Sequence, residues 1–355
     1  MDLGEKAKRT LQAFIPVIDE KISSYFTKEL SSDFGFNLRQ KRVVKEALLH
    51  AQELVLRPQK HLRGAFVVNG YLLSGKKISE SVWAAAVAVE MVHGALLMHD
   101  DFMDQDEIRR KGPTTHKYYQ EKFGGNLHLG ESMAVSVGDA LLCLGFDLLT
   151  RCENDLVTNQ MLRAIANTGF GQAYDISLEA FKNWSEEDVL ALHRAKTAIY
   201  TYENPLLIGA DLAMLSVEAK NILGEYAKDG GVAFQLRDDI LGVFGDPSET
   251  GKSANSDLLQ GKCTLLVWYV FNKGTLAQKT AVQKVWGRKK VSQGDIDNAK
   301  TAIKLSGSLD YSVALTRQLA AKAAATANKL RKLKLNPEAI DYIQGVAEYM
   351  VKRVV

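Results

Sequence analysis

The chain has 355 residues, of which 46% are hydrophobic and 25% are charged, as in a globular protein that can bury a large core. Its 45 basic and 42 acidic residues nearly balance, which argues against nucleic-acid binding, because such proteins usually carry a strong basic excess. The three cysteines are far apart, with neither metal-binding nor disulfide spacing, so we expect a cytoplasmic protein. No signal peptide is expected, and the most apolar stretch, residues 82–98, is shorter than the ~20 residues of a membrane span.

Apolar residues recur at three- and four-residue intervals along most of the chain, which predicts amphipathic helices. In chain order the expected helices cover residues 11–26, 43–56, 78–104, 132–151, 157–181, 188–202, 217–244, 258–271, 311–333 and 337–354. Pro16 should start or kink the first of them. Ser185 and Asp188 should form a capping box, and Asn336 should cap a last helix that begins at Pro337.

We find no sequence signal for a strand pair or hairpin, and no low-complexity linker. The pattern therefore predicts one all-α domain over residues 1–355, a bundle of roughly ten to twelve helices. The segments 78–104 and 217–244 are apolar nearly all round, so we expect them at the centre of the bundle.

Both of these apolar segments end in aspartates. Asp100 and Asp104 are four residues apart, so on a helix they share one face about one turn apart, and Asp101 stands beside them. Carboxylates packed this closely repel one another unless cations neutralise them. Asp238 and Asp239 end the second segment in the same way.

A single acidic pair is usually a solvated helix face or an ion-pair partner. Two such clusters, each at the end of a nearly all-apolar helix, favour metal binding instead, because buried charge must be paired or coordinated. Carboxylate ligands that leave room for water and phosphate oxygens suit Mg²⁺. The sequence therefore predicts a magnesium site.

Basic residues lie before, between and after the acidic clusters. The set consists of Lys60, Arg63, Arg109, Arg110, Lys196, Lys252 and Lys262. Each alone is typical of a surface charge, but arginine and lysine are the usual ligands of phosphate groups. Together they predict two anion sites, one bridged by metal ions and one held by lysine and arginine directly.

At this point the sequence resembles a known family, the trans-prenyl diphosphate synthases. Residues 100–104, followed by Arg109 and Arg110, look like the first aspartate-rich motif of that family, and residues 234–239 with Lys252 look like the second. Lys60 to Arg63, Lys196 with Thr197, and Lys262 occur in the expected order around them. The resemblance covers roughly residues 40 to 270, and five ordered motifs make it specific.

The resemblance implies an isoprenoid synthase fold, with helices around a central apolar cavity, and a role for each matching residue. About three Mg²⁺ would be held on an allylic diphosphate by Asp100, Asp101 (less directly), Asp104, Asp238 and, through metal-bound water, Asp239. The same diphosphate would contact Arg109, Lys196 and Lys252. Isopentenyl diphosphate would bind Lys60, Arg63, His93 and Arg110. Thr197 and Gln235 would lie beside the reacting carbons, and Lys262 near the closing loop.

Some positions depart from the family pattern or allow another interpretation. Pro58 and Gln59 replace the usual two glycines before Lys60, and His61 stands where arginine is common. Gly242 occupies the place of the third aspartate of the second motif, which leaves the ligands around the metals open. His93 could be a satisfied core histidine, but it lies two helical turns before Asp100 on the same face, which favours the cavity.

The implied function is a Mg²⁺-dependent prenyltransferase, a homodimer by family resemblance, that condenses isopentenyl diphosphate with an allylic diphosphate, head to tail and all-trans. A class I terpene cyclase shares the first motif but needs no second anion site. A non-catalytic regulatory subunit usually lacks one acidic motif, and a peptide-binding helical scaffold gives no reason for acidic ends on buried helices. Consumption of isopentenyl diphosphate would separate a synthase from a cyclase.

Product length should depend on the side chains before Asp100, because the growing tail is expected to run along that helix. Ala95, Leu96 and Val92 are small or aliphatic there. Going back along the chain from Asp100 on this face, the first aromatic residue is Trp83. At about 1.5 Å per residue this stripe accommodates several isoprene units, so we expect a product of twenty carbons or more, with geranylgeranyl diphosphate first. Close packing against a neighbouring helix is the alternative for these small residues, and Phe146 could supply the floor instead. If Ala95 forms the floor, Ala95→Phe should shorten the product.

Overall fold

The computed structural model describes residues 2–245, 255–288 and 290–352, and helices form nearly all of their regular structure. The helices are α1 (Leu3–Glu29), α2 (Leu38–Leu56), α3 (Leu62–Leu72), α4 (Glu80–Met103), α5 (Thr115–Lys122), α6 (Leu127–Thr150), α7 (Asp155–Phe181), α8 (Glu186–Leu192), the π-helix η1 (His193–Glu203), α9 (Asn204–Leu212), α10 (Val217–Phe244), α12 (Ser256–Gln260), α13 (Leu265–Lys273), α14 (Leu276–Gln283), α15 (Gln293–Leu305), α16 (Ser308–Asn328), the 3₁₀-helix η2 (Lys329–Leu333) and α17 (Pro337–Lys352). The all-α prediction is confirmed.

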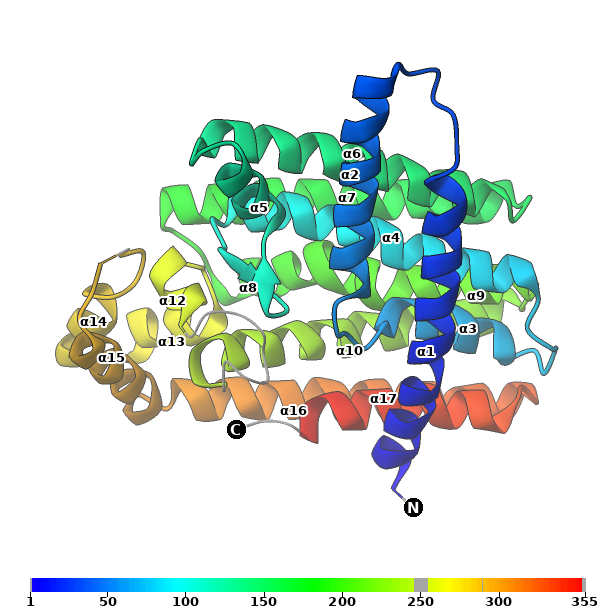
Figure 1. Ribbon diagram of the computed structural model, residues 1–355. Helices are drawn as coiled ribbons and strands as arrows, with labels where there is room; N and C mark the ends of the chain where they lie inside the picture. Colours follow the sequence, from blue (N-terminus) through cyan, green and yellow to red (C-terminus); the bar gives the residue numbers. More distant parts are fainter. Residues whose placement is uncertain (1, 246–254, 289, 353–355) are drawn as a thin grey trace.

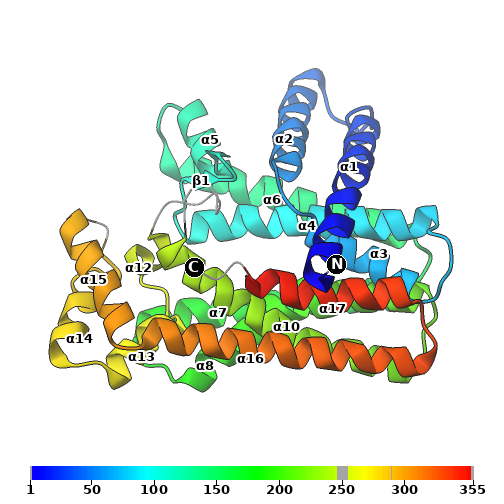
Figure 2. The same cartoon turned by 90° about the horizontal axis from the view of Figure 1, so that it is seen from below.

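The long helices α4, α6, α7, α10, α16 and α17 run roughly along one direction, and α1 and α2 lie across them (Figure 1). Helix α4 packs against α6 and α3, while α10 packs against α16 and η1. The two ends of the chain also meet, because α1 packs against α17. The α1–α2 hairpin and α5 project from one side of the bundle (Figure 2).

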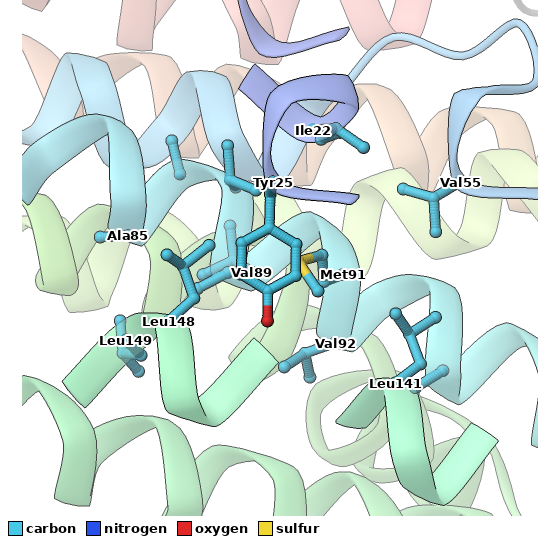
Figure 3. Packing of buried hydrophobic residues seen from close by; sticks show 14 of the residues in the cluster. Ile22, Tyr25, Val55, Ala85, Val89, Met91, Val92, Leu141, Leu148 and Leu149 are labelled. Carbon is cyan, nitrogen blue, oxygen red and sulfur yellow. The ribbon is translucent and has the colours of Figure 1, made fainter. Parts of the chain in front are cut away.

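Helix α4 is central, as its composition predicted. Its residues from Ala85 to Val89 are buried on every side of the helix, as expected for a helix without a polar face. On one side, Ile22 and Tyr25 of α1 point into the layer where α4 meets α6 (Figure 3). Gly145 of α6 permits this close approach, because a Cβ there would lie 2.7 Å from Cγ2 of Val92.

The structure contains one short hairpin, so the expectation that no hairpin occurs is wrong. Strands β1 (Ile108–Arg109) and β2 (Gly112–Pro113) pair antiparallel, with Ile108 opposite Pro113. The turn residues Arg110 and Lys111 both have positive φ, 50° and 67°. That backbone suits a tight hairpin but usually attracts asparagine, aspartate or glycine, so Arg110 and Lys111 do not indicate a turn.

Several helix predictions are confirmed and three are corrected. Helix α10 has the expected bounds, and the predicted caps at Ser185 and Asn336 form. Helix α1 begins at Leu3 and continues through Pro16, so Pro16 does not start the helix, and the kink expected there stays a prediction. The expected helix 258–271 is instead two, since Gly261 ends α12 in a left-handed conformation and Thr264 caps α13. The third correction concerns the expected helix 188–202, which is partly a π-helix and is described with the candidate active site below. The end expected for the last helix, residue 354, lies outside the described residues.

Two helices of the described chain, α4 and α6, are long and apolar enough to cross a membrane by length and composition alone. The apolar window of α4 is 67% buried, as in the core helix of a globular protein, and that of α6 is 39% buried. Helix α4, with 24 residues, is longer than the apolar stretch of residues 82–98 noted in the sequence. Length and composition are weak evidence for a span, because buried core helices pass the same test.

Candidate active site

A cavity of about 790 Å³ opens between α4, α7, η1 and α10. It gathers most of the residues singled out in the sequence. Those that line it are Lys60, Arg63, His93, Leu96, Asp100, Asp104, Arg109, Arg110, Lys196, Thr197, Gln235, Asp238, Asp239 and Lys262. Asp101, Ala95 and Val92 do not, and Lys252 lies outside the described residues.

The first acidic cluster divides between the cavity and the protein interior. Asp100 and Asp104 face the cavity from the last turn of α4, whereas Asp101 is fully buried behind them. There Asp101 accepts hydrogen bonds from the guanidinium of Arg109, with Nε at 2.7 Å from Oδ1. Asp101 thus holds Arg109, which matches the less direct role expected for it.

Ammonium groups neutralise the two cavity-facing aspartates. Lys196 Nζ lies 3.3 Å from Asp100, and Lys262 Nζ lies 2.8 Å from Asp104. Burial lowers the pKa of both lysines, but these carboxylates outweigh it and raise each pKa above its usual value. Lys262 therefore lies within the first acidic cluster, and its expected place near the closing loop stays a prediction.

Two carboxylates of α7 complete this network, and sequence reasoning missed both. Asp175 lies 2.9 Å from Lys196, and Glu179 lies 2.9 Å from Lys262. They are four residues apart on one face of α7, the same spacing as Asp100 and Asp104, and this spacing was the signal available in the sequence. They lack a second neighbouring aspartate, so they did not stand out.

The second acidic cluster ends α10 as predicted. Asp239 is buried, with Oδ2 at 3.1 Å from Nε2 of His193, and its Oδ1 accepts a hydrogen bond of 2.9 Å from Gln235. Gln235 in turn accepts a hydrogen bond of 2.7 Å from Thr197. These hydrogen bonds hold Thr197 and Gln235, the two residues expected beside the reacting carbons, next to the second acidic cluster.

Asp257 of α12 occupies the space left by Gly242, where the family motif has a third aspartate. A Cβ on Gly242 would lie 2.0 Å from Oδ2 of Asp257, so no side chain fits there while Asp257 keeps this position. Asp257 also lines the cavity. A carboxylate therefore lies where the family motif has its third aspartate. It comes from a different helix, and the sequence could not indicate that.

The residues of these clusters fit Mg²⁺ by chemistry, although the described residues form no group of three His, Cys, Asp or Glu side chains that could hold a metal as they stand. The carboxylates point to Lys196 and Lys262 rather than to a common centre. Oδ2 of Asp101 is buried with no hydrogen-bond partner, so this carboxylate keeps an unsatisfied oxygen behind Asp100 and Asp104. Such a set of hard oxygen donors around one cavity is what Mg²⁺ requires.

The π-helix η1 corrects the expected α-helix 188–202. Its wider turn places Lys196, Thr197, Tyr200 and Thr201 together on the cavity wall. Helix α10 approaches η1 closely, because a Cβ on Gly231 would lie 2.5 Å from Ala198. Contacts of this kind, which come from distant parts of the chain, are not visible in the periodicity of the segment.

Arg57, another residue missed in the sequence, holds the hairpin that carries Arg109 and Arg110. Its guanidinium donates hydrogen bonds to the carbonyl oxygens of Arg109 at 2.9 Å and Pro113 at 3.0 Å. Gly112 provides the space, because a Cβ there would lie 2.5 Å from Arg57 Cζ. The short hairpin is thereby fixed to the end of α2.

A second basic cluster, formed by Arg63, Arg110 and His93, lines the same cavity. Arg63 donates a hydrogen bond of 2.7 Å to Thr201 and lies over the ring of Tyr200 at 5.0 Å. Burial lowers the pKa of Arg110, and the charges of Arg109 and Arg63 lower it as well; although Glu90 opposes them, the pKa falls to about 10. Burial and the same arginines also hold the pKa of His93 well below its usual value, so this imidazole is neutral. The excess of positive charge suits an anion.

Of the three residues expected to control product length, one lines the cavity and two lie in the core. Leu96 lines the cavity. Ala95 is buried in the core, and Val92 packs against Gly145 of α6, so the close-packing alternative describes Val92. Their roles in chain length stay predictions.

The comparisons with known proteins agree with this site. The polyprenyl synthetase family model matches residues 45–303. A geranylfarnesyl diphosphate synthase of Aeropyrum pernix is 32% identical over 296 residues, which cover 81% of this chain and 88% of the relative. A geranylgeranyl diphosphate synthase of Methanosarcina mazei is 31% identical over 299 residues, 83% of this chain and 86% of the relative.

Solved structures show the same fold. The structure of a geranylgeranyl pyrophosphate synthase from Corynebacterium glutamicum, complexed with isoprenyl diphosphate and magnesium, superposes with a TM-score of 0.87. Its sequence is 28% identical, and the match covers 97% of this chain and 99% of that chain. The all-helical bundle is therefore the isoprenoid synthase fold. The chain belongs to the polyprenyl synthetase family and is a prenyltransferase.

Proposed function

We propose that the chain condenses isopentenyl diphosphate with an allylic diphosphate, head to tail and all-trans, and that its main product is geranylgeranyl diphosphate. The observation that carries this proposal is a cavity that is lined both by two acidic clusters and by the cluster of Arg63, Arg110 and His93. Two separate binding places for diphosphates are what a condensation of two diphosphates needs. Relatives named geranylgeranyl and geranylfarnesyl diphosphate synthases support the product class.

The acidic residues would hold Mg²⁺, about three ions per site, with Asp100, Asp104 and Asp238 as direct ligands and Asp101 and Asp239 in supporting roles. Bound Mg²⁺ stabilises a departing diphosphate as a Lewis acid. With Asp100 as a metal ligand, Lys196 would no longer pair with it and could bind the allylic diphosphate, together with Arg109 and Lys252. Lys262 would be released from Asp104 in the same way.

The remaining residues would orient the partners and exclude water. Lys60, Arg63, His93 and Arg110 would bind isopentenyl diphosphate, with neutral His93 as a hydrogen-bonding group. The hydrogen-bonded pair of Thr197 and Gln235 would face the reacting carbons and stabilise positive charge that develops there. The apolar wall of α4 would keep water from the reactive allylic group.

We also propose that residues 1–355 act as one cytoplasmic synthase domain and that two copies associate. Helix α7 exposes Leu162, Phe170 and Phe181, the last two by 76% and 78%. Exposed apolar faces of this kind are typical of interfaces. Gly169 and Ala173 of α7 line the cavity and are themselves exposed, so a second copy over α7 would close the cavity wall.

The test is incubation with isopentenyl diphosphate, each allylic diphosphate starter and Mg²⁺, followed by chromatography of the dephosphorylated products. We expect consumption of isopentenyl diphosphate and linear all-trans products. If the protein converts an allylic diphosphate but never consumes isopentenyl diphosphate, it is a cyclase. A folded protein that converts neither would support the regulatory alternative.

Leu96→Phe should shorten the main product by at least one isoprene unit, because Leu96 is the predicted length-controlling residue that lines the cavity. Val92→Phe is a matched control. It should leave product length unchanged and reduce the free energy of unfolding by about 1–3 kcal/mol, since Gly145 leaves no room for a larger side chain. The same chromatography and a urea titration measure both effects. An unchanged product distribution in Leu96→Phe would place the floor elsewhere, with Phe146 the next candidate.

A further inference from the structure

Glu90 is a buried carboxylate, only 1% exposed, to which the proposed chemistry assigns no role. It lies on α4 ten residues before Asp100, and its two oxygens have different partners. Oε2 lies 3.0 Å from Nδ1 of His61, and Oε1 accepts a hydrogen bond of 2.8 Å from the backbone N–H of Gly64. Because an unpaired buried carboxylate is costly, contacts of this quality indicate a built arrangement.

His61 is held from two sides. Its other ring nitrogen, Nε2, lies 2.8 Å from Oδ1 of Asp19 on α1. Burial lowers the pKa of His61, but Glu90 and Asp19 outweigh it and raise the pKa above its usual value. Both ring nitrogens therefore donate to carboxylates, and the imidazolium links α1 to α4.

The backbone at this point is unusual. His61 precedes the first residue of α3 with φ of 46°, a left-handed conformation that few residues other than glycine adopt, and its side chain does not cap the helix. Glu90 supplies the missing cap from another helix, because Gly64 is the third residue of α3. The contacts of Glu90 thus fix both the side chain of His61 and the start of α3.

Lys60 immediately precedes His61 and Arg63 follows it two residues later, and both cations line the cavity. The direction in which these two cations point follows from the backbone at His61 and from the first turn of α3. The amine of Lys60 lies 5.5 Å from the ring of Tyr349, and Arg63 bonds Thr201. A shift of this turn would displace both cations from the second anion site.

We propose that Glu90 is a positioning residue for the isopentenyl diphosphate site: through His61 and the N–H of Gly64 it holds Lys60 and Arg63 in place before the substrate arrives. This inference rests on the proposed function. A preformed site avoids the cost of ordering two long cationic side chains when the anion binds. Glu90 and His61 also line the cavity, but both oxygens of Glu90 already have partners in His61 and Gly64, so Glu90 is expected to act on affinity rather than on the chemical step.

Glu90→Ala removes both contacts and should raise the KM for isopentenyl diphosphate at least about tenfold, or about 1.4 kcal/mol, while the KM for the allylic substrate changes less than about threefold. Glu90→Gln is the conservative variant. Its amide can still accept from Gly64 and donate to a neutral His61, so we expect it to retain most of the affinity. Calorimetry of isopentenyl diphosphate binding alone should rank the affinities in the same way, with Glu90→Gln close to the wild type and Glu90→Ala weaker.

Asp211→Asn is the matched control, because Asp211 is also a buried carboxylate with an ion pair, to Lys220 at 2.9 Å, but lies outside the cavity lining. It should leave both KM values unchanged. If Glu90→Ala does not fold, His61→Asn decides the question, since asparagine tolerates the left-handed backbone but is too short to bridge Glu90 and Asp19. His61→Asn should raise the same KM selectively.

An equal rise of both KM values, or unchanged affinity in a folded Glu90→Ala or His61→Asn, would overturn the positioning role. A Glu90→Gln variant as impaired as Glu90→Ala would show that the charge of Glu90, not its hydrogen bonds, matters, and would overturn it too. A wild-type protein that does not consume isopentenyl diphosphate would overturn the proposed function instead.

Discussion

Asp100→Ala should lower turnover by at least about 10³-fold, because a carboxylate that holds the metal acts where negative charge develops on the departing diphosphate. The fold should survive, since Lys196, the partner of Asp100, keeps its ion pair of 2.9 Å with Asp175. Turnover measured with saturating substrates and Mg²⁺, together with circular dichroism, tests both statements.

Asp147→Ala is the control for this substitution. Asp147 is an exposed aspartate, paired with Arg151 on the outside of α6, and its loss should leave turnover unchanged. Excess chelator should abolish the activity of the wild type, and added Mg²⁺ should restore it. Full activity in chelator would contradict the metal assignment, and near-normal turnover of Asp100→Ala would remove Asp100 from it.

Arg109→Ala should have the largest effect on stability, a loss of about 3–5 kcal/mol, because it leaves Asp101 buried without its partner. It should also reduce turnover, since Arg109 is proposed to bind the allylic diphosphate. The free energy of unfolding from urea titrations measures the first effect. The double variant Arg109→Ala with Asp101→Asn should recover part of the lost stability, because a neutral amide is less costly to bury than a charge.

The same variant should respond to pH in a defined direction. Burial already raises the pKa of Asp101 to about 6, although Arg109 lowers it, so without Arg109 the pKa must rise further. A carboxyl group whose pKa is higher in the folded than in the unfolded protein contributes stability below the unfolded pKa and loses it as pH rises through the folded pKa. Arg109→Ala should therefore be less destabilised at pH 5 than at pH 8. Equal losses at both values would show that Asp101 is not the charged group that Arg109 stabilises.

The local features of the site could be predicted from the sequence because they depend on spacing within single helices. Asp100 and Asp104 share a face because they are four residues apart, and α10 was found with its observed bounds because its apolar pattern is long and regular. The order of acidic and basic motifs then indicated the family. None of this required knowledge of which helices are neighbours.

Other features followed from contacts between distant parts of the chain. The hairpin at Arg110 adopts a backbone that its own residues do not favour, and the guanidinium of Arg57 holds it. Likewise, Asp257 stands beside Gly242 because α12 folds back onto α10, a pairing that neither segment encodes alone.

The sequence by itself determined the all-helical architecture, the two acidic clusters and the set of cations that answer them, because these follow from periodicity and from the chemistry of carboxylates and ammonium groups. Only the tertiary structure decided how they are partnered: Lys262 with Asp104, Asp101 with Arg109, and Glu90 with His61. The physical reason is that a buried charge takes the partner that packing brings within reach, and that partner comes from another helix or from a neighbouring loop.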